Sequence, residues 1–169
     1  LAAIDDGQMS TIDRMGLLAD SFDTVKSGYQ PVNEYLDLLK HFDAEDALST
    51  WEIIAGSIGS IRSVLSVSDT DDSLRNAMKP FTQKLVSLQY DRLGWDVNDK
   101  ETHLDSLLRP IIVAMACGAD APDALENASA KYRAYIDKGE SLHPDVRGTI
   151  LTTMARTGGE QEYNELLGI

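Results

Sequence analysis

The sequence predicts an all-α protein, because apolar residues recur every three or four positions in one segment after another, and no stretch alternates convincingly between apolar and polar residues. Caps, prolines and glycines divide the chain into about eight helices with connections of about two to eight residues. Short connections imply antiparallel neighbours, as in a bundle or an α-solenoid. Successive helix pairs recur at about 35 to 45 residues, which favours a right-handed α-solenoid of the HEAT or armadillo kind, although no clear sequence repeat accompanies this spacing.

Local signals define the first three helices. Ser10 begins a capping box in which Asp13 replaces the usual Glu, and Gly28 ends this first helix. Pro31 suits the first turn of the second helix, where its missing N–H costs nothing. The third helix has the most regular pattern, about five turns long. The apolar faces of the three helices are Met15, Leu18, Phe22 and Val25, then Val32, Tyr35, Leu36, Leu39 and Phe42, then Leu48, Trp51, Ile54, Ala55, Ile58, Ile61 and Leu65.

Residues 67–72, with the sequence VSDTDD, form the clearest surface connection, and Asp72 can cap the fourth helix. Pro80 interrupts that helix, so we predict a kink or a local break near Asn76. The apolar face of the fourth helix comprises Leu74, Met78, Phe81, Leu85 and Leu88.

The stretch from Arg92 to Gly118 contains the most unusual residue pattern in the chain. A helix ends near Gly94, and the next begins with Thr102 or Asp99 as its cap and Glu101 in its first turn. Arg109 falls within the apolar run of this fifth helix, which is Leu104, Leu107, Leu108, Ile111, Ile112 and Met115. Its guanidinium needs a carboxylate, carbonyl oxygens or solvent, so Arg109 is either a structural tie or a binding residue.

Three further helices complete the chain. Asp120 caps the sixth, with Pro122 in the first turn, and Gly139 ends it. Residues 141–145 begin the seventh, and two glycines separate it from a last short helix. We assign Trp51, Tyr132 and Tyr135 to the core.

Composition limits the functions that the chain can have. Fifteen Lys and Arg against 28 Asp and Glu give a net charge of −13, which argues against binding nucleic acid or an anionic membrane over a broad surface. No apolar run approaches the roughly 20 residues of a membrane span. Cys117 is the only cysteine, so an internal disulfide is excluded; we expect a buried, inert thiol and a cytoplasmic location.

No catalytic motif emerges from the residues themselves. His41, His103 and His143 lie forty or more residues apart without the spacing of a zinc site. Residues 69–80 lack the glycine and the terminal acid of a calcium loop. The small residues from Gly56 to Ser60 lie inside a helix, where close approach of a second helix explains them better than a phosphate loop does.

Three separated segments resemble one known family. They are DRMGLLADSF at 13–22, LGW at 93–95 with ETHLDSLLR at 101–109, and HPDVR at 143–147. Their order and separations are similar to those in the C-terminal helical domain of M1-family zinc aminopeptidases, most nearly the puromycin-sensitive aminopeptidase and its microbial relatives. The resemblance spans essentially the whole chain. It implies that residues 1–169 are one helical-repeat domain, a fragment of the C-terminal domain of a larger chain.

The resemblance also implies a function. The parent would be a zinc exopeptidase that removes N-terminal residues from peptides. The family's His-Glu-x-x-His and Gly-x-Met-Glu-Asn motifs are absent from this sequence, so the fragment should contain neither zinc ligand nor catalytic residue and should be inactive alone. Its partners would be the catalytic domain of the same chain and peptide substrates. In the family this domain covers the catalytic cleft, so Arg109, His103 and Glu101 are the residues that we expect to line it, with a structural role favoured for Arg109.

Two alternatives remain open at this stage. The chain could be a free-standing helical-repeat scaffold that binds proteins, which a parent sequence without His-Glu-x-x-His would favour. An independent small enzyme would depend only on Cys117 and scattered acids. The resemblance favours a cleft-covering, non-catalytic aminopeptidase domain over both alternatives.

Overall fold

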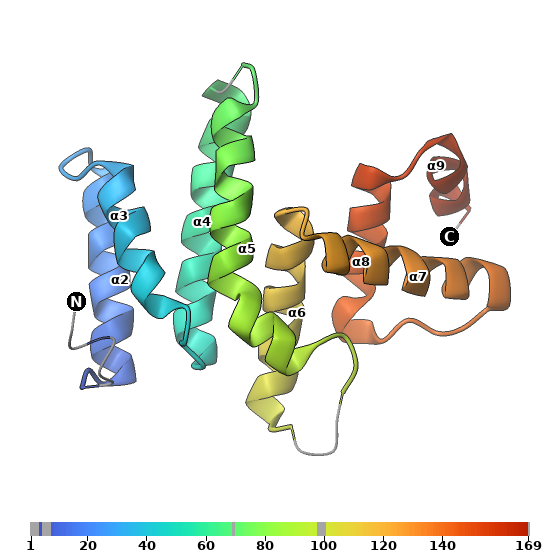
Figure 1. Cartoon of the computed structure of the whole chain (residues 1–169), viewed down its shortest axis with the longest axis horizontal. Helices are drawn as coiled ribbons and strands as arrows, with labels where there is room; N and C mark the ends of the chain where they lie inside the picture. Colours follow the sequence, from blue (N-terminus) through green and yellow to red (C-terminus); the bar gives the residue numbers. More distant parts are fainter. Residues whose placement is uncertain (1–3, 5–7, 69, 98–100, 169) are drawn as a thin grey trace. The chain divides into compact units, whose positions relative to one another are not determined.

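A computed structural model of the chain describes residues 4, 8–68, 70–97 and 101–168. These residues form eight α-helices, α2 to α9, and one 3₁₀ helix, with no strand among them, so the all-α class is confirmed (Figure 1). The chain forms two compact units, Leu1–Gln89 and Tyr90–Ile169, and the division falls within α5. The solenoid arrangement and the single domain over residues 1–169 stay predictions.

The first unit contains α2 (Thr11–Lys26), α3 (Val32–Leu39), the 3₁₀ helix (Lys40–Phe42), α4 (Leu48–Ser68) and most of α5 (Ser73–Leu93). Helix α2 packs against both α3 and α4. The largest fully buried side chains of this unit are Trp51, Tyr35, Phe42, Leu18, Leu39, Ile54 and Ile58. Tyr35 also satisfies its hydroxyl, which donates to Oγ of Ser57 at 2.8 Å, so its polar group costs little when buried.

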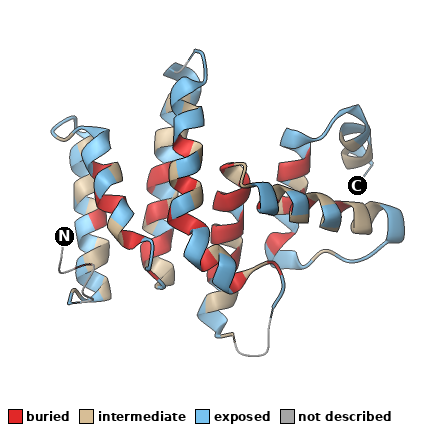
Figure 2. Ribbon diagram, viewed as in Figure 1, coloured by how far each residue is buried: buried red, intermediate tan, exposed pale blue. Residues whose placement is uncertain are grey.

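The second unit contains the end of α5, then α6 (His103–Gly118), α7 (Pro122–Lys138), α8 (Pro144–Thr157) and α9 (Glu160–Leu167). Helix α8 packs against α6, α7 and α9. Figure 2 shows α6 as extensively buried, whereas α9 has no buried residue. Polar contacts help to hold α9: Arg133 of α7 forms an ion pair with Glu165, and the hydroxyl of Tyr132 donates to the same carboxylate at 3.1 Å.

The helix starts at Ser10 and Thr102 were predicted correctly, whereas Pro31 lies at the N-cap of α3 and not in its first turn. Ser10 caps α2 by accepting from N–H of Asp13, and Thr102 forms a reciprocal capping box with Asp105 on α6. The other cap proposed for α6, Asp99, lies outside the described residues. Glu101 precedes α6 and is not in its first turn.

The predicted cap at Asp120 is wrong. Asp120 has a positive φ of 54°, and Ala121 is the residue at the N-cap of α7. The carboxylate of Asp120 instead pairs with Arg156 of α8 at 2.5 Å. The carboxylate of Asp120 is therefore used in an ion pair with α8 and does not cap α7.

The predicted apolar faces are partly wrong at the helix ends. Leu74 and Leu88 of α5 are 57% and 53% exposed, and Leu104 and Leu107 of α6 are 60% and 45% exposed. Helical spacing places a residue on a face, but only a neighbouring helix buries it. Helix α5 is also continuous through Pro80, so the local break is absent.

The expectation of close helix approach at Gly56 and Gly59 is also wrong for this chain. A Cβ added at either glycine would meet no atom within 4 Å, and both residues are exposed. Of the glycines and serines in this run only Ser57 is buried, where it accepts a hydrogen bond from the hydroxyl of Tyr35.

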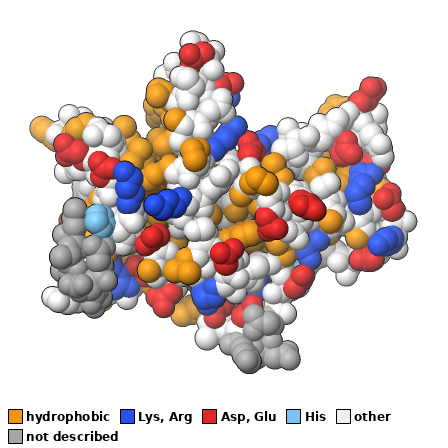
Figure 3. All heavy atoms as spheres, in the orientation of Figure 1, with side chains coloured by type: hydrophobic (Ala, Val, Ile, Leu, Met, Phe, Trp, Pro, Cys, Tyr) orange, Lys and Arg blue, Asp and Glu red, His pale blue; other side chains and the backbone are white. Residues whose placement is uncertain are grey.

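Charged side chains of both signs are scattered over the face drawn in Figure 3. Figure 3 shows acidic and basic groups interspersed on the face in view, without a broad basic area. Of the helices in the described part of the chain, none is both long and apolar enough to cross a membrane.

Candidate functional site

The three residues predicted to line a cleft lie close together in sequence but differ in exposure. The side chains of Arg109 and Glu101 are 1% and 7% exposed, and they form an ion pair between Nη2 and Oε2. His103 is exposed in the first turn of α6. The structure therefore encloses two of the predicted residues and presents the third to solvent.

Arg109 has a second tie besides Glu101. Its Nε donates to the main-chain carbonyl of Leu93 at 3.3 Å, at the end of α5. Its Nη1 is buried and has no hydrogen-bond partner among the described residues. Within the second unit, the guanidinium thus connects α6 to the end of α5 and to Glu101, which precedes the N-cap of α6.

The start of α6 is fixed by a second polar group. The carboxylate of Asp105 accepts from N–H and Oγ1 of Thr102 at 2.9 and 2.8 Å, and Arg92 donates to it at 2.6 Å. The N–H of Thr102 is the main reason why the pKa of Asp105 falls to about 2, with the hydroxyl and Arg92 acting in the same direction. This arrangement holds His103, which lies between the two capping residues, on an ordered turn.

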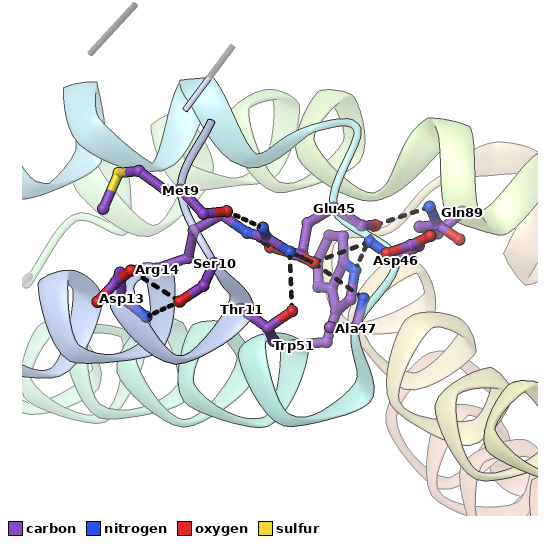
Figure 4. Close-up of polar contacts among 10 residues, drawn as sticks. All are labelled: Met9, Ser10, Thr11, Asp13, Arg14, Glu45, Asp46, Ala47, Trp51 and Gln89. Atoms are coloured by element: carbon purple, nitrogen blue, oxygen red, sulfur yellow. Dashed lines mark hydrogen bonds and ion pairs between the residues drawn. The ribbon is translucent and has the colours of Figure 1, made fainter. Parts of the chain in front are cut away.

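A buried carboxylate in the first unit accepts four hydrogen bonds, and no sequence pattern indicated it. The side chain of Glu45, between the 3₁₀ helix and α4, is 2% exposed. Figure 4 shows Arg14 of α2 facing it, with hydrogen bonds of 2.7 Å from Nε to Oε2 and 2.9 Å from Nη2 to Oε1. The N–H groups of Asp46 and Ala47 donate to the same carboxylate at 3.1 and 2.9 Å.

The main chain of Glu45 extends this network. Its carbonyl oxygen accepts from Nε1 of Trp51 at 2.9 Å and from Nε2 of Gln89 at 2.7 Å (Figure 4). Burial opposes ionisation of Glu45, but the bonds from Arg14 and from the two N–H groups outweigh it and hold the pKa of this carboxyl below its usual range. Glu45 therefore joins α2, the start of α4 and α5.

Neither buried charge pair has the features of a catalytic centre. Arg14 and Glu45 form a hydrogen-bonded pair, and a carboxylate of lowered pKa such as Glu45 is a poor general base. Arg109 and Glu101 form a buried ion pair that faces no reactive side chain among the hydrogen bonds described above. Cys117 is buried, and burial raises the pKa of its thiol, with Thr153 opposing this. Within the described ranges, no group of three or more His, Cys, Asp or Glu could hold a metal ion.

The chain was compared with known proteins. A family model described as the ERAP1-like C-terminal domain matches residues 1–169. The chain is 31% identical over 166 residues to Aminopeptidase 2 of Candida albicans, covering 97% of this chain and 18% of that protein. It is 28% identical over 162 residues to the alanine/arginine aminopeptidase of Saccharomyces cerevisiae (95% and 19%), and 28% over 159 residues to the glutamyl aminopeptidase of Sus scrofa (94% and 16%). The chain thus spans less than a fifth of the length of each of these relatives.

Proposed function

This chain belongs to the family of ERAP1-like C-terminal domains, and on that basis we propose that it is part of the non-catalytic C-terminal domain of an M1-family zinc aminopeptidase. One observation carries this proposal: the match runs from residue 1 to 169, and the relatives that share it are named aminopeptidases. The parent would hydrolyse peptides from their N-terminus. The free-standing scaffold has no observation in its favour.

The zinc of the parent would be held outside this chain. The described residues do not fit a zinc site, because a catalytic zinc needs three protein ligands, and no cluster of that size is present among them. We therefore assign this chain no metal ligand, and we propose that it is inactive alone. Aminoacyl-arylamide substrates should show no turnover with the isolated chain, with or without added zinc; hydrolysis that requires the chain would contradict this.

The role that we propose for the domain is to cover the active-site cleft and to help admit and position the peptide. Its partners are then the catalytic domain of the same chain and the peptide. His103 is the one predicted lining residue with an exposed side chain, so we assign direct peptide contact to it. Direct contact of Arg109 or Glu101 with a peptide would require their buried ion pair to open. We therefore assign these two residues a supporting role, in which they stabilise the start of α6.

The test uses the full-length parent. We expect His103→Ala to lower kcat/KM for peptides of about ten residues two- to fivefold, the loss of one partly exposed polar contact, and to leave a short aminoacyl-arylamide unaffected. Leu104→Ala, an exposed position on the next residue, serves as the matched control. A parent without aminopeptidase activity would refute the proposed function, whereas an active parent with unchanged long-peptide kinetics would refute only the role of His103.

We also propose that the parent resides in the cytoplasm, since a single buried thiol suits a reducing compartment. Fractionation of the source cells, followed by detection of the parent, tests this. Recovery with organelles or in the medium would contradict it.

A further inference from the structure

A small pocket in the second unit is lined by the connection after α5, by α7 and by the start of α8. Its volume is about 150 Å³, and a cavity of this size is large enough to hold a benzene molecule. Trp95, Val146 and Ile150 form its buried floor, and Ala134 and Leu142 are partly exposed in its wall. The pocket therefore has room and apolar surface for a short aliphatic chain.

Three charged side chains line this pocket, two acids and one base, and they are Asp96, Glu140 and Lys131. Lys131 of α7 donates to Oδ1 of Asp96 at 2.7 Å, although the two residues lie 35 positions apart in sequence. Glu140 belongs to the connection between α7 and α8, and its side chain is 61% exposed, with Nζ of Lys138 at 3.9 Å. The lining thus contains an adjacent acid and base and a second acid on another segment.

The polar groups of the lining keep hydrogen-bonding capacity for a ligand. The contact between Lys131 and Asp96 uses one of three ammonium donors and one of two carboxylate oxygens. The hydroxyl of Ser141 has no hydrogen-bond partner within the described ranges, whereas Nδ1 of His143 accepts from N–H of Asp145 at 3.4 Å. Because an exposed ion pair contributes little to stability, a ligand can share Lys131 and Asp96 at small cost.

We propose that this pocket binds a free basic α-amino acid, lysine or arginine. Such a molecule carries the reverse set of charges, one carboxylate and two cations. Its α-carboxylate and α-ammonium are attached to the same carbon, so they match the adjacent Lys131 and Asp96. Its side-chain cation then pairs with Glu140, and its aliphatic stem covers the apolar floor.

Other classes of small ligand fit the lining less well. A simple anion would face the two acids, and an apolar amino acid would leave Glu140 without a partner from the ligand. The net charge of −13 also favours the approach of a cation. None of Arg109, His103 and Glu101 lines this pocket, so binding here does not depend on the proposed peptide contacts.

The experiment uses the full-length parent, labelled at its leucine methyl groups, with L-lysine as the probe. Binding is read from the NMR signals of Leu142, which Leu142→Ile identifies, because this side chain lines the pocket. The measurement needs no turnover, so a parent without aminopeptidase activity would refute the proposed function and leave this test valid. Three analogues each remove one charge: cadaverine lacks the carboxylate, Nα-acetyl-L-lysine lacks the α-ammonium, and L-norleucine lacks the side-chain cation.

The variant that tests the pocket is Lys131→Gln, which removes the partner of the carboxylate. The matched control is Lys26→Gln on α2, since Lys26 also belongs to an exposed ion pair, with Asp23 at 2.6 Å. Both substitutions should keep the fold, because exposed ion pairs contribute little. The analogues test the same charges on the unaltered protein.

We expect L-lysine to shift the Leu142 signals in a saturable manner, with half-saturation at about 1 mM for a ligand of this size. Each analogue should bind about tenfold more weakly, the loss of one charge-assisted contact. Lys131→Gln should weaken L-lysine about tenfold and leave cadaverine unchanged, whereas Lys26→Gln should change neither. Unshifted Leu142 signals at about 20 mM L-lysine would overturn the proposal. Binding of L-norleucine as tight as that of L-lysine would also overturn it, because the pocket would then not select a basic amino acid.

Discussion

The carboxylate of Glu45 holds the guanidinium of Arg14 through two hydrogen bonds, from Nε to Oε2 at 2.7 Å and from Nη2 to Oε1 at 2.9 Å. Thirty-one residues separate the two in sequence. The same carboxylate accepts hydrogen bonds from the N–H groups of Asp46 and Ala47, just before α4. The carbonyl oxygen of Glu45 accepts hydrogen bonds from the side chains of Trp51 and Gln89. One residue outside any helix therefore connects three helices of the first unit.

Removal of this carboxylate should destabilise the first unit strongly. We expect Glu45→Ala to lower the free energy of unfolding by about 3 kcal/mol, because it leaves the Arg14 guanidinium without its partner in a largely buried position. Urea denaturation measures the change. Glu52→Ala, at an exposed position on α4, should change it by less than about 0.5 kcal/mol. Equal losses in the two variants would show that the Glu45 network contributes little.

The same pair should make stability depend on acid pH. The pKa of Glu45 is lower in the folded protein than its ordinary value of 4.5, so the unfolded chain binds the proton more readily. The contribution of Glu45 is therefore fully present above about pH 4.5 and is lost as pH falls through the folded pKa. The stabilities of wild type and Glu45→Gln should differ clearly at pH 7, and the difference should shrink as the pH falls below about 4.5. A difference that stays constant across this range would contradict the assignment.

Residues that act on their immediate neighbours could be predicted from sequence. The caps at Ser10 and Thr102 are such cases, because donor and acceptor lie within three residues. Asp120 could not be predicted in this way, because its carboxylate pairs with Arg156, 36 residues later in the sequence, and does not cap α7. Glu45 had no local signal, and Gln89, 44 residues away, completes its network.

Burial of apolar residues was predictable only in part for the same reason. Periodicity placed Met78 and Leu85 of α5 correctly in the core. Leu74 and Leu88 follow the same period but are exposed, because burial depends on which neighbouring helix reaches each turn.

Alanine at the two exposed glycines of α4 should stabilise the protein. Gly56→Ala and Gly59→Ala each reduce the entropy of the unfolded chain at a helical position where the new methyl group meets no atom within 4 Å. We expect a gain of about 0.5 to 1 kcal/mol per substitution. Thermal unfolding of the single and double variants measures it. A loss of stability would mean that another surface packs closely on these glycines.

The capping box of α6 can be tested by measuring both the stability of the protein and the pKa of Asp105. Thr102→Ala removes the hydroxyl that accepts from N–H of Asp105 at 3.2 Å and donates to its carboxylate at 2.8 Å, so stability should fall by about 1 kcal/mol. The pKa of Asp105, about 2 in the intact protein, should rise but stay below normal, because N–H of Thr102 and Arg92 remain. NMR titration of the carboxyl carbon reads this value. Thr102→Ser, which keeps the hydroxyl, should preserve both quantities, and a rise of the pKa in this variant would contradict the role of the hydroxyl.

The ion pair of Arg109 and Glu101 should be a structural tie that supports α6. Arg109→Ala leaves the Glu101 carboxylate buried without its cation, and we expect a loss of about 3 to 5 kcal/mol. Adding Glu101→Ala to the Arg109→Ala variant should restore part of the lost stability, since it removes the buried charge that has lost Arg109. Urea denaturation of the single and double variants measures this coupling. In the full-length parent, kinetics on long peptides should then follow the folded fraction of Arg109→Ala. Unchanged stability with weaker binding of long peptides would instead make Arg109 a substrate-contacting residue.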